Sequence, residues 1–298
     1  MQIIQTIQAL ETERHQWHGS VGFVPTMGFL HEGHLSLFQK ARSAHTILVA
    51  SIFVNPTQFG PHEDLARYPR NLARDLQLLE AVGVDVVFTP SASEMYPEAF
   101  MTFVEPGGVL ANQGEGAARP GHFRGVATVV LKLFSLIQPH SAYFGQKDAQ
   151  QVAVIQRMVK DLNLPVTIQV GSTIRENDGL AMSSRNSYLT PPQRHAATIL
   201  YQALQAGRKL FESDPTTDTR LVLQAMQTVI AQEPLARLEY IELRHAETFL
   251  SLERLQAPAL LLLAVSIGAT RLIDNFIYRT HGSWDTGQVL YSSSETNI

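Results

Sequence analysis

The chain has 298 residues, enough for about two domains, since one domain takes roughly 150 residues. Apolar residues make up 45% and charged residues 17% of the chain, a composition that can fill packed cores and is unlike that of disordered proteins. The 23 basic and 27 acidic residues give a net charge of −4. That balance argues against general binding to nucleic acids or membrane surfaces, which needs a basic field, although it still allows a local basic pocket.

The chain contains no cysteine. Disulfides, thiolate zinc sites, iron–sulfur clusters and cysteine nucleophiles are therefore excluded. The first residues, MQIIQTIQALETE, lack the basic and then apolar order of a signal peptide. The longest apolar run, Ala257–Val265, is much shorter than the roughly 20 residues of a membrane-spanning helix. We therefore expect a soluble, cytoplasmic protein without a membrane partner.

Short β-branched runs alternate with amphipathic segments over the first half of the chain. Strand–helix alternation with short connections predicts an α/β domain with a doubly wound parallel sheet. The predicted elements, in chain order, are strands over Val21–Pro25 and Thr46–Val54 with a helix between them, a helix near Arg70–Val82 that ends at Gly83, a strand over Val84–Phe88, a loop-rich stretch from Pro90 to Gly121, a helix over Val126–Ile137, a strand over Ala142–Phe144, a helix over Gln150–Leu162 and a strand over Val166–Val170.

The pattern changes after Gly171. Consecutive strands without helices between them predict antiparallel pairing, and hence a second, smaller α+β domain. Its predicted elements are helices over Pro191–Phe211 and Leu221–Gln232, followed by strands over Leu238–Leu243, Ala259–Ile267 and Arg271–Phe276. We expect a first domain over residues 1–172, a second over residues 173–280, and a flexible tail over residues 281–298, which are rich in Ser, Thr and Gly.

The densest chemical signal is the segment PTMGFLHEGHLSL, Pro25 to Leu37. It leads from the first predicted strand into the first helix, where a doubly wound sheet binds its ligand. Gly28 and Gly33 allow close backbone approach, and a helix N-terminus offers free N–H groups to phosphate. His31 and His34 are three residues apart, not four as in a metalloprotease zinc helix. The segment therefore predicts a phosphate site; the alternative is a glycine-rich turn with two surface histidines.

The string HEGH (31–34) resembles the H-x-G-H signature of the class I nucleotidyltransferase superfamily, and the longer segment resembles the pantothenate synthetase (pantoate–β-alanine ligase) family. Four further segments follow in the order of that family: SIFVNPTQF (51–59), RPGHFRGV (119–126), FGQKDAQQ (144–151) and DGLAMSSRN (178–186). The resemblance runs from about Val21 to Asn275. It implies a Rossmann-like domain over residues 1–172 that binds ATP and pantoate, and an α+β lid domain over residues 173–280.

The activity implied by the resemblance is ATP-dependent ligation of (R)-pantoate and β-alanine to pantothenate, with release of AMP and pyrophosphate, in pantothenate and coenzyme A biosynthesis. The reaction passes through a pantoyl-adenylate. Both nucleophiles belong to the substrates, so the protein supplies position and charge neutralisation. The resemblance also implies Mg²⁺ together with ATP, and a homodimer.

The resemblance places His34 at the proton-donor position. An imidazole N–H there can stabilise the charge that develops on the α-phosphate and on the departing pyrophosphate. Lys147, Ser183, Ser184 and Arg185 supply cations and hydroxyls suited to a triphosphate. The full set that the resemblance assigns to ATP is Met27, Gly28, Phe29, Leu30, His31, Glu32, Gly33, His34, Gly145, Gln146, Lys147, Asp148, Ile174, Met182, Ser183, Ser184 and Arg185.

Two glutamines match pantoate-binding positions of the family, Gln58 in NPTQF and Gln151 in KDAQQ, and Gln58 also matches a β-alanine position. An amide can hold a hydroxyl or a carboxylate without adding charge. Arg124 is a candidate either for the substrate carboxylate or for structural pairing. Asp75 and Asp148 are equal candidates for a Mg²⁺ ligand, so the metal ligands stay unassigned.

The chain departs from the family pattern at two positions, since Gln146 replaces the usual Glu and Ala149 replaces the usual aromatic residue. Neither change affects Lys147 or Gln151. Two alternatives stay open: another H-x-G-H nucleotidyltransferase that stops at a nucleotidyl product, and a nucleotide-binding module without turnover. The second domain and the two acid-binding glutamines favour the ligase over the first alternative. The presence of both histidines, Lys147 and the MSSR segment (182–185) argues against the second.

Overall fold

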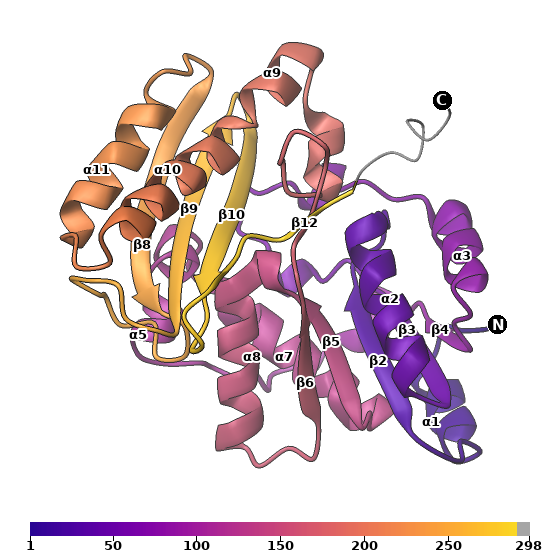
Figure 1. Ribbon diagram of the computed structural model, residues 1–298. Helices are drawn as coiled ribbons and strands as arrows, with labels where there is room; N and C mark the ends of the chain where they lie inside the picture. Colours follow the sequence, from indigo (N-terminus) through magenta and orange to yellow (C-terminus); the bar gives the residue numbers. More distant parts are fainter. Residues whose placement is uncertain (291–298) are drawn as a thin grey trace, which may run out of the picture. The chain divides into compact units, whose positions relative to one another are not determined.

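The computed structural model describes residues 1–290, and Figure 1 shows their helices and strands. The chain folds into two compact units. The N-terminal unit consists of residues 1–145 and 150–171, and the C-terminal unit consists of residues 146–149 together with the chain from Ser172 onward. The predicted first domain, residues 1–172, therefore differs from the N-terminal unit by the short segment 146–149 and by Ser172, which group with the C-terminal unit.

The N-terminal unit is built on a six-stranded sheet in the order β1-β4-β3-β2-β5-β6, in which every pair of neighbours is parallel. The chain order reverses between β2 and β5, so the predicted doubly wound sheet is confirmed. Ligands bind such sheets at the carboxyl ends of the strands beside this reversal. The strands are β1 (Gln2–Ile4), β2 (Val21–Thr26), β3 (Ile47–Ile52), β4 (Val86–Phe88), β5 (Ser141–Gly145) and β6 (Thr167–Gly171).

Helices cover both faces of this sheet. Neighbouring residues of a strand point to opposite faces, and the central strands carry buried apolar residues on both, so each face needs a layer of helices over it. Phe23 of β2 packs in one core with Val126 and Phe134, whereas Val24 packs in another with Phe38. The longer helices are α1 (Ile7–Arg14), α2 (Glu32–Ala44), α3 (Leu72–Ala81), α7 (His122–Ile137) and α8 (Ala149–Asp161). Short helices are α4 (Ala92–Met95), α5 (Val109–Asn112), α6 (Glu115–Ala118), and the 3-10 turns η1 (Pro56–Gln58) and η2 (Leu65–Arg67).

The C-terminal unit holds a four-stranded antiparallel sheet in the order β11-β10-β9-β8, as predicted for its consecutive strands. The central strand β9 is buried at every residue and packs with the apolar faces of α10 and α11. Its strands are β8 (Ala236–His245), β9 (Ala259–Ile267), β10 (Thr270–Tyr278) and β11 (Trp284–Asp285). Its helices are α9 (Pro191–Ala196), α10 (Ile199–Ser213), α11 (Thr219–Ile230), and the 3-10 turns η3 (Gln146–Asp148) and η4 (Ser184–Tyr188).

Some predicted elements differ from the observed ones. The predicted helix over Pro191–Phe211 is two helices, because α9 ends at Ala196 and α10 begins at Ile199. The loop-rich stretch from Pro90 to Gly121 contains α4, α5 and α6. β1 and α1 were not predicted, since their short or weakly patterned apolar residues give no clear periodicity.

Part of the segment for which a flexible tail is predicted, residues 281–298, forms strands. Trp284 and Asp285 pair with β10, and the ring of Trp284 stacks on Phe211 with centroids 6.3 Å apart. β12 (Gln288–Val289) pairs in parallel with β7 (Ile174–Arg175). Backbone hydrogen bonds and aromatic packing hold these residues, and neither was visible in the Ser, Thr and Gly content. Residues 291–298 lie outside the described residues.

A glycine on α7 allows that helix to approach the turn η1. A Cβ added at Gly125 would lie 2.3 Å from the carbonyl oxygen of Thr57 and 2.6 Å from the backbone nitrogen of Gln58. Both obstacles are backbone atoms, which cannot rotate away as the end of a side chain can. The position of Gln58 relative to the sheet therefore depends on a residue without a side chain at 125.

Gly125→Ala is expected to lower the free energy of unfolding by about 2 kcal/mol or more. Overpacking against rigid atoms costs roughly 1–3 kcal/mol, and we expect this cost to be larger than the stability that alanine gains over glycine inside a helix. Urea unfolding measures this. Gly107→Ala is the control, since a Cβ there meets nothing within 4 Å; it should change stability by less than about 0.5 kcal/mol. Equal effects of the two substitutions would contradict the packing argument.

Candidate functional site

The loop between β2 and α2 is held by a buried carboxylate from α3. Gly28 and Phe29 have φ values of 81° and 52°, and the N–H groups of Phe29 and Leu30 donate to the two oxygens of Asp75 at 2.7 and 2.8 Å. Asp75 is 1% exposed. It therefore fixes the backbone of the predicted ATP loop, a role that sequence reasoning missed when it considered Asp75 only as a metal ligand.

The two histidines of HEGH lie together at the N-terminus of α2. His31 is the N-cap residue, its backbone N–H donates to Nδ1 of His34 at 3.3 Å, and the two ring centroids are 4.0 Å apart. A neutral imidazole that accepts at Nδ1 carries its proton on Nε2. This arrangement makes Nε2–H of His34 a hydrogen-bond donor beside a helix N-terminus, whose dipole favours an anion.

Gln58 follows β3 in the turn η1, and its side-chain amide has a defined orientation. Its Oε1 accepts from Nδ2 of Asn55 at 3.0 Å, and its Nε2 donates to the sulfur of Met27 at 3.3 Å. The structure thus brings the predicted pantoate glutamine against the first residue of the predicted ATP loop. Both belong to the N-terminal unit.

Asn55 is the residue that orients Gln58, and sequence reasoning missed it. Besides Gln58, its Nδ2 donates to the carbonyl of Gly125 at 3.2 Å, while its Oδ1 accepts from the hydroxyls of Tyr96 at 2.8 Å and Thr57 at 2.9 Å. Burial raises the pKa of Tyr96, against a hydrogen bond with Thr57, so its hydroxyl keeps the proton that it donates. An Asn directly before Pro-Thr-Gln, the N-cap position of the turn, was the available signal.

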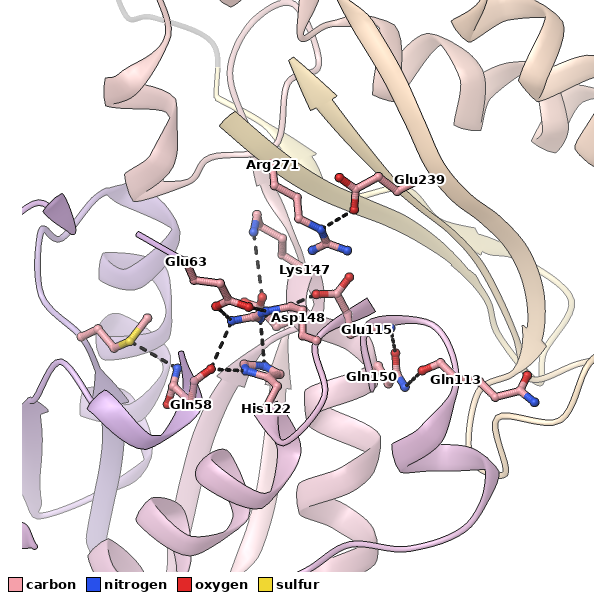
Figure 2. A network of polar contacts seen from close by, with 12 residues as sticks. Gln58, Glu63, Gln113, Glu115, His122, Lys147, Asp148, Gln150, Glu239 and Arg271 are labelled. Carbon is pink, nitrogen blue, oxygen red and sulfur yellow. Dashed lines mark hydrogen bonds and ion pairs between the residues drawn. The ribbon is translucent and has the colours of Figure 1, made fainter. Parts of the chain in front are cut away.

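The backbone of Gln58 is held from the other side by three polar residues. Its carbonyl oxygen accepts from Nδ1 of His122 at 2.9 Å and from Arg119 at 3.3 Å. Arg119 also makes two bonds to the carboxylate of Glu63, at 2.8 and 2.7 Å, and lies 3.1 Å from Nε2 of His122 (Figure 2). This network joins the loop after η1 to the start of α7.

The charges of this network follow from its burial. Burial and the positive charge of Arg119 lower the pKa of His122 to about 4, so that the ring is neutral at pH 7. Burial opposes ionisation of Glu63, but its hydrogen bond with Arg119 and the charge of Arg119 outweigh burial and lower the pKa of Glu63. The neutral ring of His122 donates from Nδ1 to Gln58 and accepts at Nε2 from Arg119.

The two adjacent glutamines at the start of α8 differ in their environment. Gln150 is buried, and its amide donates to the carbonyl of Leu110 at 2.9 Å. The amide also accepts from the N–H of Glu115 at 2.9 Å and donates to the carbonyl of Gln113 at 2.7 Å (Figure 2). Gln151 is partly exposed, and its side chain makes no hydrogen bond within residues 1–290. Gln150 therefore holds the loop around α5 and α6, and the predicted ligand position is Gln151.

The other predicted ATP residues lie in the C-terminal unit, apart from Gly145, which ends β5. Lys147 and Asp148 lie in η3, with Nζ of the lysine 3.9 Å from a carboxylate oxygen of the aspartate (Figure 2). Ile174 of β7 accepts the N–H of Met182 at 2.9 Å. Met182 begins the other predicted ATP segment of this unit, Met182–Arg185. In it the hydroxyl of Ser183 accepts the N–H of Arg185 at 3.3 Å, and Ser184 is the first residue of η4.

Arg124 has a structural partner. Its Nε lies 3.1 Å from a carboxylate oxygen of Glu105, and its guanidinium stands 3.8 Å from the centroid of the Phe103 ring. Of the two roles that the sequence left open for Arg124, structural pairing is the one that these contacts support.

No group of three or more His, Asp or Glu side chains within residues 1–290 is arranged to hold a metal ion. None of the helices in the same residues is long and apolar enough to cross a membrane.

Comparison with known proteins identifies the relatives of the chain. Residues 2–277 match a family model described as pantoate-beta-alanine ligase. Pantothenate synthetase of Roseiflexus castenholzii is 57% identical over 277 residues, which cover 93% of this chain and 99% of the relative. Pantothenate synthetase of Herpetosiphon aurantiacus is 54% identical over 278 residues, which cover 93% of this chain and 100% of the relative.

Two solved structures share the fold of the chain. Pantothenate synthetase from Thermus thermophilus superposes with a TM-score of 0.88 at 48% identity, covering 92% of this chain and 98% of the other. Pantoate-beta-alanine ligase from Francisella tularensis, complexed with beta-gamma ATP and beta-alanine, superposes with a TM-score of 0.78 at 38% identity, covering 93% and 97%. These matches span both units and favour the ligase over the two alternatives that the sequence left open.

The network around Gln58 predicts a pH dependence of stability. The unfolded chain takes up a proton on His122 near pH 6.5, whereas the folded chain does so only near pH 4. The contribution of His122 is therefore complete above about pH 6.5 and is lost as the pH falls toward about 4, by up to about 1.4 kcal/mol per pH unit. His122→Gln keeps a donor for the Gln58 carbonyl but cannot titrate. Urea unfolding between about pH 7.5 and pH 5 should show a smaller loss of stability in the variant; identical slopes would contradict the assignment.

Proposed function

The chain belongs to the pantoate–β-alanine ligase family, and from this membership we propose how its residues carry out the ATP-dependent ligation of pantoate and β-alanine in pantothenate biosynthesis. One observation carries the proposal: the amide of Gln58 lies against Met27 of the ATP loop. Activation of an acid by ATP needs its carboxylate beside the α-phosphate, so an acid-binding amide must adjoin a phosphate-binding loop. The contact between these two residues meets that requirement.

The reaction has two steps in this proposal. A carboxylate oxygen of pantoate attacks the α-phosphate of ATP, the bond to the β-phosphate breaks, and pyrophosphate leaves with the electron pair. The amine of β-alanine then attacks the acyl carbon of the pantoyl-adenylate, AMP leaves, and the amine loses a proton. Gln58 and Gln151 hold the hydroxyl and carboxylate oxygens of pantoate, and Gln58 also holds β-alanine. His34 donates from Nε2 to the phosphate, where charge develops in the first step.

The C-terminal unit supplies the positive charge. Lys147 and Arg185, with the hydroxyls of Ser183 and Ser184, bind the triphosphate and stabilise the departing pyrophosphate. We propose that this unit is a lid, because a pantoyl-adenylate hydrolyses when water reaches it and closure excludes water. Binding of ATP by the lid residues provides the difference in affinity that such a closure requires.

Mg²⁺ would accompany the triphosphate and neutralise part of its charge. Such ions use one or two protein carboxylates and take their other ligands from phosphate and water. Of the two carboxylates considered from the sequence, Asp75 is buried and accepts from Phe29 and Leu30, whereas Asp148 is half exposed beside Lys147. Asp148 is therefore the better of the two candidates.

We also propose that the chain works in the cytoplasm as a homodimer. ATP is a substrate there, and two-fold dimers are the commonest symmetric assemblies. The resemblance to the family supports a dimer formed through the N-terminal unit. Sedimentation velocity decides the assembly, and a species of 33 kDa at micromolar concentration would contradict the dimer.

The product mixture tests the proposed reaction. With pantoate, β-alanine and Mg-ATP, the protein should form pantothenate with one AMP and one pyrophosphate per turnover, measured by chromatography. When β-alanine is withheld, pyrophosphate release should be limited to about one turnover and should require pantoate. ADP as the stoichiometric product, or pyrophosphate release that is indifferent to pantoate, would reject acyl-adenylate chemistry.

His34→Ala is expected to lower kcat by about two to four powers of ten, the usual effect of losing one acid–base or oxyanion-stabilising group. Its melting temperature should stay close to that of the wild type, since the ring contributes little apolar packing. His18→Ala serves as the control, because His18 is exposed before β2. A wild-type kcat in His34→Ala would remove the proton-donor role.

Gln58→Ala and Gln151→Ala should raise KM for pantoate while leaving ATP binding unchanged. Loss of one such hydrogen bond costs about 0.5–1.5 kcal/mol, which corresponds to about a 2- to 13-fold change. Steady-state kinetics and calorimetric titration with an ATP analogue measure the two effects, and Gln227→Ala on the exposed face of α11 is the control. A matching loss of ATP affinity would contradict the division of roles.

A further inference from the structure

Two consecutive residues of β10, Asp274 and Asn275, support both of the segments in the C-terminal unit that are assigned to the triphosphate. Asn275 contacts the turn η3, which carries Lys147, and Asp274 reaches the segment Met182–Arg185 through Arg175. Both β10 side chains are buried, at 3% and 4% exposure. The side chain of Asn275 donates to carbonyl oxygens of η3, so it acts on the backbone that carries Lys147.

Asn275 uses all of its amide hydrogen-bonding groups on η3. Its Nδ2 donates to the carbonyl oxygens of Gln146 at 3.1 Å and Lys147 at 2.9 Å, and its Oδ1 accepts from Nε2 of Gln146 at 3.2 Å. Two successive carbonyls and the side chain of Gln146 are thereby fixed. This fixes the peptide planes on both sides of the Cα atom of Lys147, which set the direction in which the lysine leaves the backbone.

Asp274 supports the second segment through Arg175. Its two oxygens accept from Nη1 and Nη2 of Arg175 at 2.6 and 2.9 Å, and the guanidinium is fully buried. Arg175 forms an antiparallel bridge with Ala181 and donates to the carbonyl of Gly179 at 3.0 Å. The segment that begins at Met182 therefore directly follows a turn, residues 176–181, that Arg175 holds at Gly179 and at Ala181.

The two supports are joined to each other. Oδ1 of Asp274 accepts the backbone N–H of Asn275 at 2.8 Å, and the carbonyl oxygen of Asn275 lies 3.4 Å from Nη2 of Arg175. The guanidinium stands 4.9 and 5.2 Å from the ring centroids of Tyr201 and Phe276, so it has little room to shift. A displacement of Asp274 would therefore move both ATP segments.

The chemistry of the contacts explains which side chains they need. Asn275 must donate twice and accept once, which an amide can do and a carboxylate cannot. Gln146, the residue that departs from the family pattern, donates from its side-chain amide to Oδ1 of Asn275. This contact uses the acceptor of Asn275, and both of its N–H groups donate to the backbone carbonyls. A buried guanidinium requires a paired carboxylate, because an uncompensated buried charge costs several kcal/mol.

We propose that Asp274 and Asn275 are positioning residues for ATP, which set Lys147 and Arg185 as one group on a common support. This inference rests on the proposed function, in which η3 and Met182–Arg185 bind the triphosphate. Neither positioning residue touches substrate. Their substitution should affect the use of ATP and leave the use of pantoate unchanged, because Gln58 and Gln151 lie in the other unit.

Asn275→Ala and Asn275→Asp test the first support in the full-length enzyme. Both should raise KM for ATP by about tenfold or more, with KM for pantoate within about twofold of the wild type, and the aspartate should be the worse because it repels the two carbonyls. Hydrogen exchange in a peptide over residues 145–149 should become faster in the ATP-free variants. Asn112→Ala, at an exposed site on α5, is the control. An unchanged KM for ATP, or an equal rise of both KM values, would overturn the proposal.

Asp274→Asn leaves Arg175 charged and buried, so that variant can fail to fold. The pair Arg175→Met with Asp274→Leu removes both charges and keeps similar volumes, a replacement that buried ion pairs often tolerate. The double variant should fold, exchange hydrogen faster over residues 179–186, and show a raised KM for ATP. A double variant with wild-type melting temperature and wild-type KM for ATP would overturn the role of the ion pair.

Lys147→Ala and Arg185→Ala separate this inference from the proposed function on which it rests. If neither changes the affinity for an ATP analogue, the ATP assignment of these segments fails, whatever Asn275 does. If both weaken ATP binding but exchange over residues 145–149 is unaltered in Asn275→Ala, the ATP assignment stands and the positioning role fails. Weaker ATP binding together with faster exchange supports both.

Discussion

The C-terminal unit depends on the buried ion pair between Arg175 and Asp274. A guanidinium without solvent contact needs a carboxylate in bidentate geometry and acceptors for its remaining N–H groups, and the fold supplies them from β10 and from the carbonyl of Gly179. The residue before β12, which pairs with β7, lies so close to Arg175 that it must be a glycine. A Cβ at Gly287 would lie 2.9 Å from Nε of Arg175 and 2.4 Å from the carbonyl of Thr173. One buried charge thus determines where β7, β10, β12 and the segment after Ala181 meet.

The N-terminal unit uses buried polar side chains in the same way. Asp75 holds the backbone of the loop before α2, Asn55 turns the amide of Gln58, and His122 with Arg119 holds its carbonyl. The side chains of Asp75, Asn55 and His122 are buried and hydrogen-bonded within the protein. In a reaction whose nucleophiles belong to the substrates, catalysis depends mainly on position, and buried hydrogen bonds provide it at little entropic cost during the reaction.

In the proposed function, the two units contribute different groups to the two substrates. The groups proposed for pantoate in the N-terminal unit, the amides of Gln58 and Gln151, are neutral. The groups proposed for the triphosphate in the C-terminal unit include the cations Lys147 and Arg185. A carboxylate nucleophile held by neutral amides keeps its electron density for attack, whereas an ion pair with a lysine or arginine would lower its reactivity. In the proposed reaction the cations instead act on the triphosphate, where negative charge accumulates as pyrophosphate leaves.

The sequence by itself determined the α/β class, the doubly wound sheet, the antiparallel second sheet, the family and the nature of the reaction. Periodicity and motif content depend on neighbouring residues, and parallel strands place motifs such as PTMGFLHEGH and NPTQF at one edge of the sheet. Only the tertiary structure assigned residues 146–149 to the second unit and gave strands to residues 284–289. The tertiary structure alone revealed the hydrogen bonds of Asp75 to the loop before α2, those of Asn275 to η3, and the ion pair of Arg175 with Asp274. Their partners lie 46, 129 and 99 residues away in the chain, and no local pattern encodes a hydrogen bond across such a separation.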